Sequence, residues 1–196
     1  MIKSDAITGI LLAAGTSQRF GGDKLLHTLP NGVPIAVASV QLLKASVDRA
    51  LAVVNPQATR LAQLLEQMGL TVVTCPEAEQ GMSHSLACGI NASADAQGWV
   101  IALADMPFIQ VATFYKVVHY LRQGTAIVAP QFQGQRGHPV GFQKQFRESL
   151  CSLSGDRGAR TLLQQNAITL FPCHDAGILQ DIDSYQDIRR KDHVHS

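Results

Sequence analysis

Residues 7–24 have the sequence ITGILLAAGTSQRFGGDK, in which an apolar run gives way to a loop rich in glycine and positive charge. Residues 7–12 are typical of a strand that is buried on both faces, as in a parallel sheet. Beyond residue 24, short apolar runs alternate with amphipathic stretches of helical length. This alternation predicts βαβ units and an α/β protein with a mainly parallel sheet.

The alternating pattern continues to the end of the chain. We expect strands at residues 7–12, 51–54, 71–74, 99–103, 126–129, 139–142 and 168–171. We expect helices near residues 34–47, 58–68, 83–92, 113–122, 144–150, 159–165 and 184–190. No repeat or long linker interrupts this order, so the sequence predicts one domain over residues 1–196.

Three unusual segments follow predicted strands directly. They cover residues 13–24, 80–85 and 104–107. Ligands of open α/β sheets bind beyond the carboxyl ends of the strands. We therefore expect these three segments to meet at one binding site.

Composition excludes several classes of partner and compartment. Hydrophobic residues make up 46% of the 196 residues, and the net charge is +1, so the chain has material for a core but no field for nucleic acid. No apolar run approaches the ~20 residues of a membrane span, and no signal peptide is visible. The four scattered cysteines are typical of a reducing compartment. We expect a cytoplasmic protein that binds neither nucleic acid nor membrane.

The glycine-rich loop has the features of a polyphosphate site. Gly15, Gly21 and Gly22 permit backbone N–H groups to approach a phosphate closely, and Arg19 and Lys24 add positive charge. A triphosphate needs both amide donors and cations. The alternative, a flexible surface loop with incidental charges, fits poorly with so dense a cluster directly after a core strand.

Two common phosphate-binding loops do not match this segment. A dinucleotide fingerprint requires G-x-G-x-x-G, whereas Gly15 is followed by TSQR. A Walker loop requires Gly-Lys-Ser/Thr, whereas Lys24 is followed by Leu25. The missing dinucleotide fingerprint disfavours a dehydrogenase.

The pattern A-A-G-x-S-x-R-F-G…K at residues 13–24 resembles the signature loop of nucleotidyltransferases related to the molybdenum cofactor cytidylyl- and guanylyltransferases. The resemblance extends over about residues 7–188. It implies a doubly wound, Rossmann-like α/β/α fold and a loop that wraps the triphosphate of a nucleotide. It also implies catalytic roles for Arg19 and Lys24, and a nucleotide site that includes Leu12, Ala13, Ala14 and Gly15.

Carboxylates at two places are candidate metal ligands. Asp105 lies at the mouth of a buried strand, in a segment similar to the family's L-x-x-D-M-P. A strand-end Asp also serves as a turn or cap residue, but the resemblance implies that Asp105 binds nucleotide through Mg²⁺ or Mn²⁺. Alternation places Asp181 and Asp183 on one side of an extended segment, with Ile182 toward the core.

The resemblance makes Asp183 the second metal ligand, while the alternative is that Asp183 or Ser184 caps the final helix. The family has Thr-Pro after this Asp. Here Ser184-Tyr185 takes that place, which predicts a less rigid helix start.

Residues 81–86, GMSHSL, are similar to the cytidylyltransferase branch, in which this stretch faces the base and ribose. The similarity implies that Gly81 and Ser85 bind nucleotide, although Ser83 also suits a helix N-cap. The guanylyl branch tends to have a different stretch here and glycine at the position of Ala14. Both departures favour CTP over GTP.

Two segments resemble the acceptor-binding region of the family. GQRGHPVGF at residues 134–142 contains the family's R-G-H-P-V, and GDRGAR at 155–160 is similar to its G-D-x-G-A-R. The resemblance implies that Arg136, His138 and Arg157 contact an anionic acceptor such as molybdopterin. A lone histidine is more often structural, and a surface arginine beside a capped helix is an equal alternative for Arg157.

These features together predict a magnesium-dependent nucleotidyltransferase that moves CMP from CTP to a molybdopterin-type cofactor and releases pyrophosphate. The attacking group is an ionised phosphate, so the reaction needs no general base. The expected partners are CTP, the cofactor and a recipient molybdoenzyme. The alternatives are a relative that uses GTP or a sugar or polyol phosphate, and a non-catalytic carrier of the cofactor. Retention of Arg19, Lys24 and Asp105 disfavours the carrier.

Overall fold

The computed structural model describes residues 6–15, 20 and 23–189. Within these residues, eight strands form one sheet, in the order β3-β2-β1-β4-β7-β5-β6, with β8 beside β5. The strands are β1 Ile7–Leu12, β2 Arg49–Val54, β3 Thr71–Thr74, β4 Gly98–Leu103, β5 Ile127–Phe132, β6 Gln135–Arg136, β7 Val140–Gln143 and β8 Thr169–Pro172.

The sheet is mixed and mainly parallel, as the sequence predicts. Strand β1 pairs in parallel with β2 on one side and β4 on the other, and β2 pairs in parallel with β3. Strand β7 runs antiparallel to β4 and β5. The chain therefore builds outward from β1 in one direction and then crosses to β4, which makes the gap between β1 and β4 the topological switch point.

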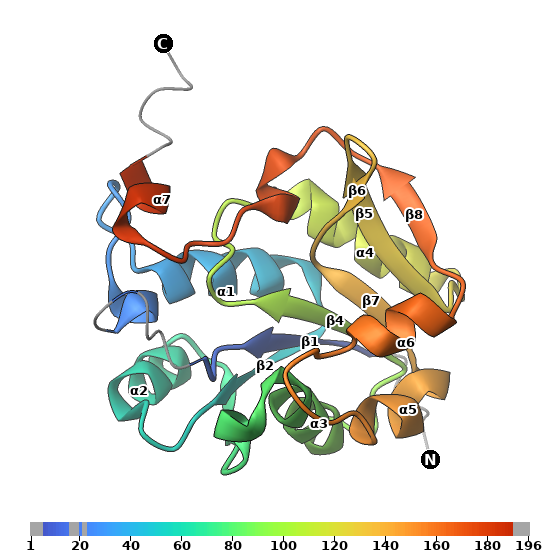
Figure 1. Ribbon diagram of the computed structural model, residues 1–196, viewed down its shortest axis with the longest axis horizontal. Coiled ribbons are helices and arrows are strands. Elements are labelled where there is room, and N and C mark those ends of the chain that lie inside the picture. The colour runs from blue at the N-terminus through green and yellow to red at the C-terminus, as the bar shows by residue number, and fades with distance from the viewer. Residues whose placement is uncertain (1–5, 16–19, 21–22, 190–196) are drawn as a thin grey trace.

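Helices cover both faces of the sheet (Figure 1). One core contains residues of α1 Ile35–Ser46, α2 Thr59–Gln67 and α4 Val111–Arg122. The other contains residues of α3 Met82–Ala92, α5 Arg147–Cys151 and α6 Arg160–Gln165. Side chains alternate along each strand, so Val100 of β4 enters the first core and Trp99 the second. The doubly wound α/β/α prediction is confirmed.

Within the described part of the chain, four short elements were not predicted. They are β6, which forms a hairpin with β5, and the 3₁₀ helices η2 Lys24–Leu26, η3 Ala78–Gln80 and η5 Ala176–Leu179. The helix expected near residues 144–150 is formed by the 3₁₀ helix η4 Lys144–Phe146 followed by α5. The terminal helix α7 spans Tyr185–Arg189. Among the described residues, no helix is long and apolar enough to cross a membrane.

Helix α3 begins earlier than the sequence indicates. Its N-cap is Gly81 at φ 125° and ψ 167°, a conformation that favours glycine. The interpretation of Ser83 as the N-cap is wrong, because the Ser83 hydroxyl donates instead to the carbonyl of Gly158 at 3.4 Å.

Candidate active site

The loops after β1, β2 and β4 begin at the same level of the sheet. Leu12 at the end of β1 is in register with Leu103 at the end of β4. The amide of Ala104 donates to the carbonyl of Leu12 at 3.1 Å, and the amide of Ala13 donates to the carbonyl of Val53 at 2.9 Å. The pairing of buried strands therefore brings together the starts of two of the segments that the sequence singled out, residues 13–24 and 104–107.

Lys24 joins the two candidate metal ligands. Its Nζ donates to Asp105 Oδ2 at 2.8 Å and to Asp183 Oδ1 at 3.4 Å. The Lys24 side chain is 10% exposed, against 25% for Asp105 and 49% for Asp183. Two carboxylates that are far apart in the sequence thus share one cation at the switch point.

Backbone contacts hold Asp105 and Asp183 side by side. The amide of Ile182 donates to the carbonyl of Asp105 at 2.9 Å, and the Ile182 side chain is fully buried, as alternation predicts. On the other side of this loop, the hydroxyl of Ser39 in α1 donates to the carbonyl of Ala104 at 2.9 Å. A buried side chain and a helix therefore fix the position from which the Asp105 carboxylate projects.

A capping arrangement replaces the family's Thr-Pro at the start of α7. Asp187 Oδ2 accepts hydrogen bonds from the Ser184 amide and hydroxyl, both at 2.8 Å, and from the Asp183 amide at 3.2 Å. This resembles a capping box, in which side chain and backbone satisfy each other at a helix start. Asp187 thus holds the backbone of Asp183 and Ser184 at the helix start, where the sequence predicted less rigidity.

A third carboxylate increases the negative charge at this place. Desolvation raises the pKa of Asp181, and the charges of Asp183 and Asp105 act in the same direction. Two carboxylates thus contact one ammonium group and a third lies within electrostatic range of them, and the surplus negative charge favours a further cation. Oxygen-rich, partly exposed donors of this kind fit Mg²⁺ or Mn²⁺.

A cavity of about 530 Å³ lies beside the carboxylates. It is lined by every described residue that the sequence assigned to the nucleotide: Leu12, Ala13, Ala14, Gly15, Lys24, Gly81, Ser85 and Asp105. Arg19, the remaining assignment, lies outside the described residues. Glu79 and Asp156 also line the cavity and were missed by the sequence analysis. Gly15 and Asp105 thus face the same space.

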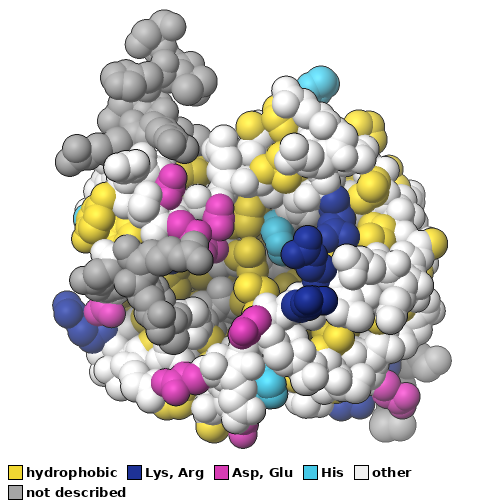
Figure 2. Space-filling view, viewed as in Figure 1, with side chains coloured by type: hydrophobic (Ala, Val, Ile, Leu, Met, Phe, Trp, Pro, Cys, Tyr) yellow, Lys and Arg dark blue, Asp and Glu magenta, His cyan; other side chains and the backbone are white. Residues whose placement is uncertain are grey.

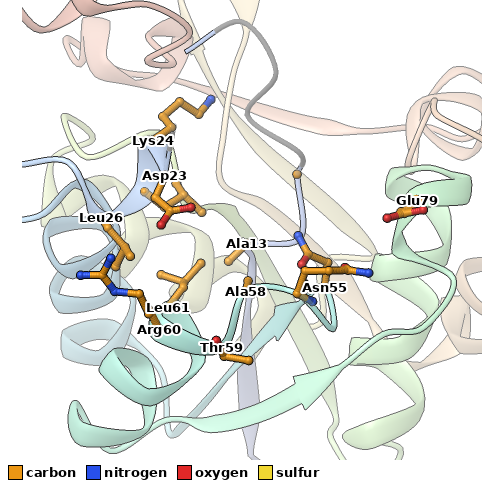
Figure 3. A pocket seen from close by; sticks show the side chains of 13 residues that line it. Ala13, Asp23, Lys24, Leu26, Asn55, Ala58, Thr59, Arg60, Leu61 and Glu79 are labelled. Carbon is orange, nitrogen blue, oxygen red and sulfur yellow. Dashed lines mark hydrogen bonds between the residues drawn. The ribbon is translucent and has the colours of Figure 1, made fainter. Parts of the chain in front are cut away.

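A second cavity, of about 320 Å³, extends this space toward the start of α2 (Figure 3). It shares Ala13, Gly15, Lys24, Leu25 and Glu79 with the first. Figure 3 shows Asn55 across the cavity from Asp23. Asn55 Nδ2 donates to the carbonyl of Ala14 at 3.4 Å, so it links the loops after β1 and β2. Asn55 follows β2 directly, and this position at the end of a strand is the sequence feature that could have identified it as a site residue.

A third cavity, of about 280 Å³, is lined by the three predicted acceptor residues Arg136, His138 and Arg157. Arg160, from the same GDRGAR segment, lines it too and was not predicted. The cavity shares Leu12, Met82 and Leu103 with the 530 Å³ cavity. The 530 Å³ and 280 Å³ cavities together form one hollow on the surface. Figure 2 shows this hollow with an apolar floor, acidic side chains on one side and basic side chains with a histidine on the other.

His138 is a neutral group in this basic surrounding. Burial lowers its pKa from 6.5 to about 4, the charge of Arg136 acts in the same direction, and that of Asp105 opposes it. Its Nδ1 is buried and has no hydrogen-bond partner in the described part of the chain. The imidazole therefore lines the cavity beside the arginines without adding charge at neutral pH.

Gly81 allows the GDRGAR loop to reach the start of α3. A Cβ at Gly81 would lie 2.5 Å from Asp156 Oδ1 and 2.5 Å from the backbone of Gly155. The amide of Ser83 donates to the carbonyl of Gly155 at 3.1 Å. The loop that contains Arg157 is thus hydrogen-bonded to helix α3, which contains Ser85. The same helix and loop therefore line both the 530 Å³ and the 280 Å³ cavities.

Gly15, Lys24 and two carboxylates at the switch point of a doubly wound sheet are typical of a ligand-binding α/β protein. Residues 9–169 match the MobA-like NTP transferase domain, and the chain belongs to this family of nucleotidyltransferases.

Two relatives align over nearly the whole chain. Purine catabolism protein PucB of Bacillus subtilis (strain 168) is 31% identical over 96% of this chain and 98% of its own length. Nicotine blue oxidoreductase of Paenarthrobacter nicotinovorans is 26% identical over 94% of this chain and 95% of its own length.

A solved structure shows the same fold. Rv0371c from Mycobacterium tuberculosis H37Rv superposes with a TM-score of 0.83 at 25% identity, covering 96% of this chain and 98% of that chain. Its complex with manganese superposes with a TM-score of 0.78 at 23% identity, covering 94% of this chain and 96% of that chain.

Proposed function

We propose that the protein transfers CMP from CTP to the phosphate of a molybdopterin-type cofactor and releases pyrophosphate. One observation carries this proposal: the cavity lined by Lys24 and Asp105 adjoins a cavity lined by Arg136 and Arg157, and the two have Leu12, Met82 and Leu103 in common. A nucleotidyl transfer requires an acceptor phosphate close to the reacting phosphorus of the nucleotide. Adjoining cavities, one beside the glycine-rich loop and one lined by arginines, meet that requirement.

In the proposed reaction an acceptor phosphate oxygen attacks the α-phosphorus of CTP. A new P–O bond forms while the bond to the leaving pyrophosphate breaks. Lys24, Arg19 and the amides of the glycine-rich loop stabilise the negative charge on the nucleotide. Asp105 and Asp183 would hold Mg²⁺ or Mn²⁺, which supplies positive charge to the α-phosphate.

The preference for CTP rests on the walls of the larger cavity. Ala14 and Ser85 are buried and line it, and the Ala14 methyl occupies space that glycine would leave free. A smaller space favours a pyrimidine over a purine. The resemblance of residues 81–86 to the cytidylyltransferase branch supports the same choice.

The acceptor side calls for an anion with heteroatoms that can hydrogen-bond. Arg136, Arg157 and Arg160 supply charge for a phosphate, and His138 supplies a neutral hydrogen-bonding group. A molybdopterin-type cofactor combines a phosphate with a polar ring system. A recipient molybdoenzyme in the cytoplasm would then accept the product.

Pyrophosphate release tests the proposal. The purified protein is assayed with CTP, GTP, ATP or UTP, each combined with molybdopterin, a sugar phosphate or a polyol phosphate. The expected result is release that requires CTP and molybdopterin together, that a chelator abolishes and that Mg²⁺ or Mn²⁺ restores. Release that is equally fast with GTP would refute the CTP preference, and release only with a sugar phosphate would refute the acceptor.

The names of the relatives suggest two further arms of this assay. Because Rv0371c has been solved with manganese, Mn²⁺ is tested beside Mg²⁺. Because one relative is named an oxidoreductase, oxidation of NADH and NADPH is measured in parallel. Nicotinamide oxidation without pyrophosphate release would contradict the transferase proposal.

A further inference from the structure

Two thiols and a carboxylate meet next to the nucleotide cavity. The Sγ atoms of Cys75 and Cys88 and a carboxylate oxygen of Glu77 all lie within 4.8 Å of one another. Cys75 is fully buried, Cys88 is partly buried and Glu77 is exposed. The cluster thus extends from the core to the surface, with the carboxylate on the solvent side.

The sheet and a helix fix the positions of the two cysteines. The amide of Cys75 donates to the carbonyl of Val54 at 2.9 Å, which continues the pairing of β3 with β2. The amide of Ala78 donates to the carbonyl of Cys75 at 3.2 Å and closes the turn that presents Glu77. Cys88 lies in α3, three residues after Ser85 and therefore on the same side of the helix. The two thiols are therefore close together because the pairing of β3 with β2 positions Cys75 and helix α3 positions Cys88.

The groups around Cys88 in the described part of the chain oppose its ionisation. Burial raises its pKa to about 12, the hydrogen bond and charge of Cys75 act in the same direction, and the charge of Glu77 adds to them. A cation bound between Cys75, Cys88 and Glu77 would act against these effects, because a bound metal ion favours the thiolate form of its cysteine ligands.

We propose that Cys75, Cys88 and Glu77 form a binding site for a thiophilic d¹⁰ metal ion, with Zn²⁺ as the natural occupant. Two thiolates, one carboxylate and one water make a tetrahedral set that suits Zn²⁺. With Zn–S bonds of about 2.3 Å, ligand atoms in such a set lie about 3.8 Å apart, so the three side chains need to move by about 1 Å or less. Binding would release the two thiol protons.

This site would select a different ion from the carboxylates at the switch point. Thiolates prefer soft or borderline ions, whereas Asp105 and Asp183 offer only hard oxygen donors suited to Mg²⁺. The ion would join the turn that contains Glu77 to helix α3. That turn leads directly into Ala78 and Glu79, which line the nucleotide cavity. The bound ion would therefore stabilise one wall of that cavity.

Cadmium provides a direct test, because Cd²⁺ bound to thiolate has an ultraviolet charge-transfer absorption that carboxylate ligands do not give. The full chain, kept reduced with a phosphine, is titrated with Cd²⁺ alone and then with Zn²⁺. We expect the absorption to saturate at one Cd²⁺ per chain, Zn²⁺ to abolish it, and Zn²⁺ to raise the midpoint of thermal unfolding.

Variants assign the signal to the three side chains. Cys88→Ser should abolish the absorption at one equivalent, and Glu77→Gln should weaken Zn²⁺ binding by at least about tenfold, since even outer-shell partners of a metal are worth that much. Cys173→Ser is the matched control, because its Sγ contacts the Gln131 carbonyl, away from the cluster. It should bind as the wild type does.

The absence of a charge-transfer band in the reduced wild type would overturn the proposal. So would a band that survives in Cys88→Ser or disappears in Cys173→Ser. The buried Cys75 is tested by Cys75→Ser, and if that variant does not fold, Cys88→Ser and Glu77→Gln decide the matter. A Cys75–Cys88 disulfide in the isolated protein, with no Cd²⁺ bound after reduction, would also refute a metal site.

Discussion

The two sides of the central hollow are built in different ways (Figure 2). On the acidic side, Lys24 joins Asp105 and Asp183 through its single ammonium group, and backbone hydrogen bonds fix the loops beneath them. On the basic side, Arg136, Arg157 and Arg160 are exposed. Within the described ranges, none of these three guanidinium groups forms an ion pair.

This difference indicates that the acidic side is preorganised for catalysis, whereas the basic side recognises the acceptor. Groups that are held in place before the ligand arrives stabilise a transition state without further ordering. Exposed arginines gain their contacts when an anionic ligand binds, and they lose side-chain freedom in doing so. Changes on the acidic side should therefore lower kcat, and changes on the basic side should raise the KM of the acceptor.

The largest effect is expected for Asp105→Ala. Loss of this carboxylate removes both a proposed metal ligand and the closest partner of Lys24, which is 2.8 Å away. We expect kcat to fall by roughly a thousandfold or more, since single electrostatic groups of this kind contribute about a hundredfold to a thousandfold and a bound metal adds to that. Pyrophosphate release under saturating substrates measures kcat.

Asp95→Asn is the matched control for that variant. Asp95 pairs with Arg49 at 2.8 Å on the exposed surface, outside all three cavities. Its replacement should leave kcat unchanged. Should Asp105→Ala retain more than a tenth of the wild-type kcat while circular dichroism shows an intact fold, the acidic side would not be the catalytic half.

The next effect concerns His138 and pH. Its pKa of about 4 in the folded protein is below the ordinary value of 6.5, so between these values the unfolded chain binds more protons than the folded one. The free energy of unfolding should therefore fall as pH decreases from about 6.5 to about 4. The loss amounts to about 3 kcal/mol, from 1.36 kcal/mol per pKa unit.

Urea unfolding of the wild type and His138→Gln between pH 7 and pH 4 isolates this effect. The titration of carboxylates affects the free energy of unfolding of both proteins equally. The difference between the two free energies of unfolding therefore gives the contribution of His138. We expect His138→Gln to lose about 3 kcal/mol less than the wild type over this range. Parallel curves would show that the imidazole is as accessible to protons in the folded protein as in the unfolded chain.

Arg136→Ala should affect only the acceptor. Hydrogen bonds to charged groups contribute about 1.5–3 kcal/mol, which corresponds to an increase in the acceptor KM of roughly tenfold to a hundredfold. The KM for CTP should stay within about twofold. Arg122→Ala, which breaks a surface pair with Asp48 at 2.7 Å, is the control. A rise in the KM for CTP alone would reverse the assignment of the two cavities.

The sequence predicts the acidic side better than the basic side. Residues 7–12 and 99–103 are buried apolar strands, and parallel pairing brings the loops that follow them to one edge. Local pattern is enough for that inference. The basic side depends on how loops fold over α3, which has no periodic signal, and so Arg160 was missed although it lies in the same short segment as Arg157.

Contacts between the two ends of the chain also could not be predicted from local sequence patterns. Nothing in the sequence shows that Tyr185, in the last helix, meets Phe20 of the glycine-rich loop. The two rings stack with centroids 4.1 Å apart, and His27 meets Tyr185 edge-on at 5.0 Å. Such a contact depends on the path of the whole chain, because Ile182 must first pair with Asp105 before α7 can reach the loop.

The smallest effect is therefore expected for Tyr185→Ala, which tests whether α7 helps to order the acidic side from outside. An aromatic pair contributes about 0.5–1.5 kcal/mol beyond its buried area, so the KM for CTP should rise by roughly twofold to tenfold while the acceptor KM stays constant. Tyr185→Phe keeps the ring and should behave as the wild type. If Tyr185→Ala instead raised the KM of the acceptor, the stack on Phe20 would act across the hollow, and the two sides would not be as independent as their contacts indicate.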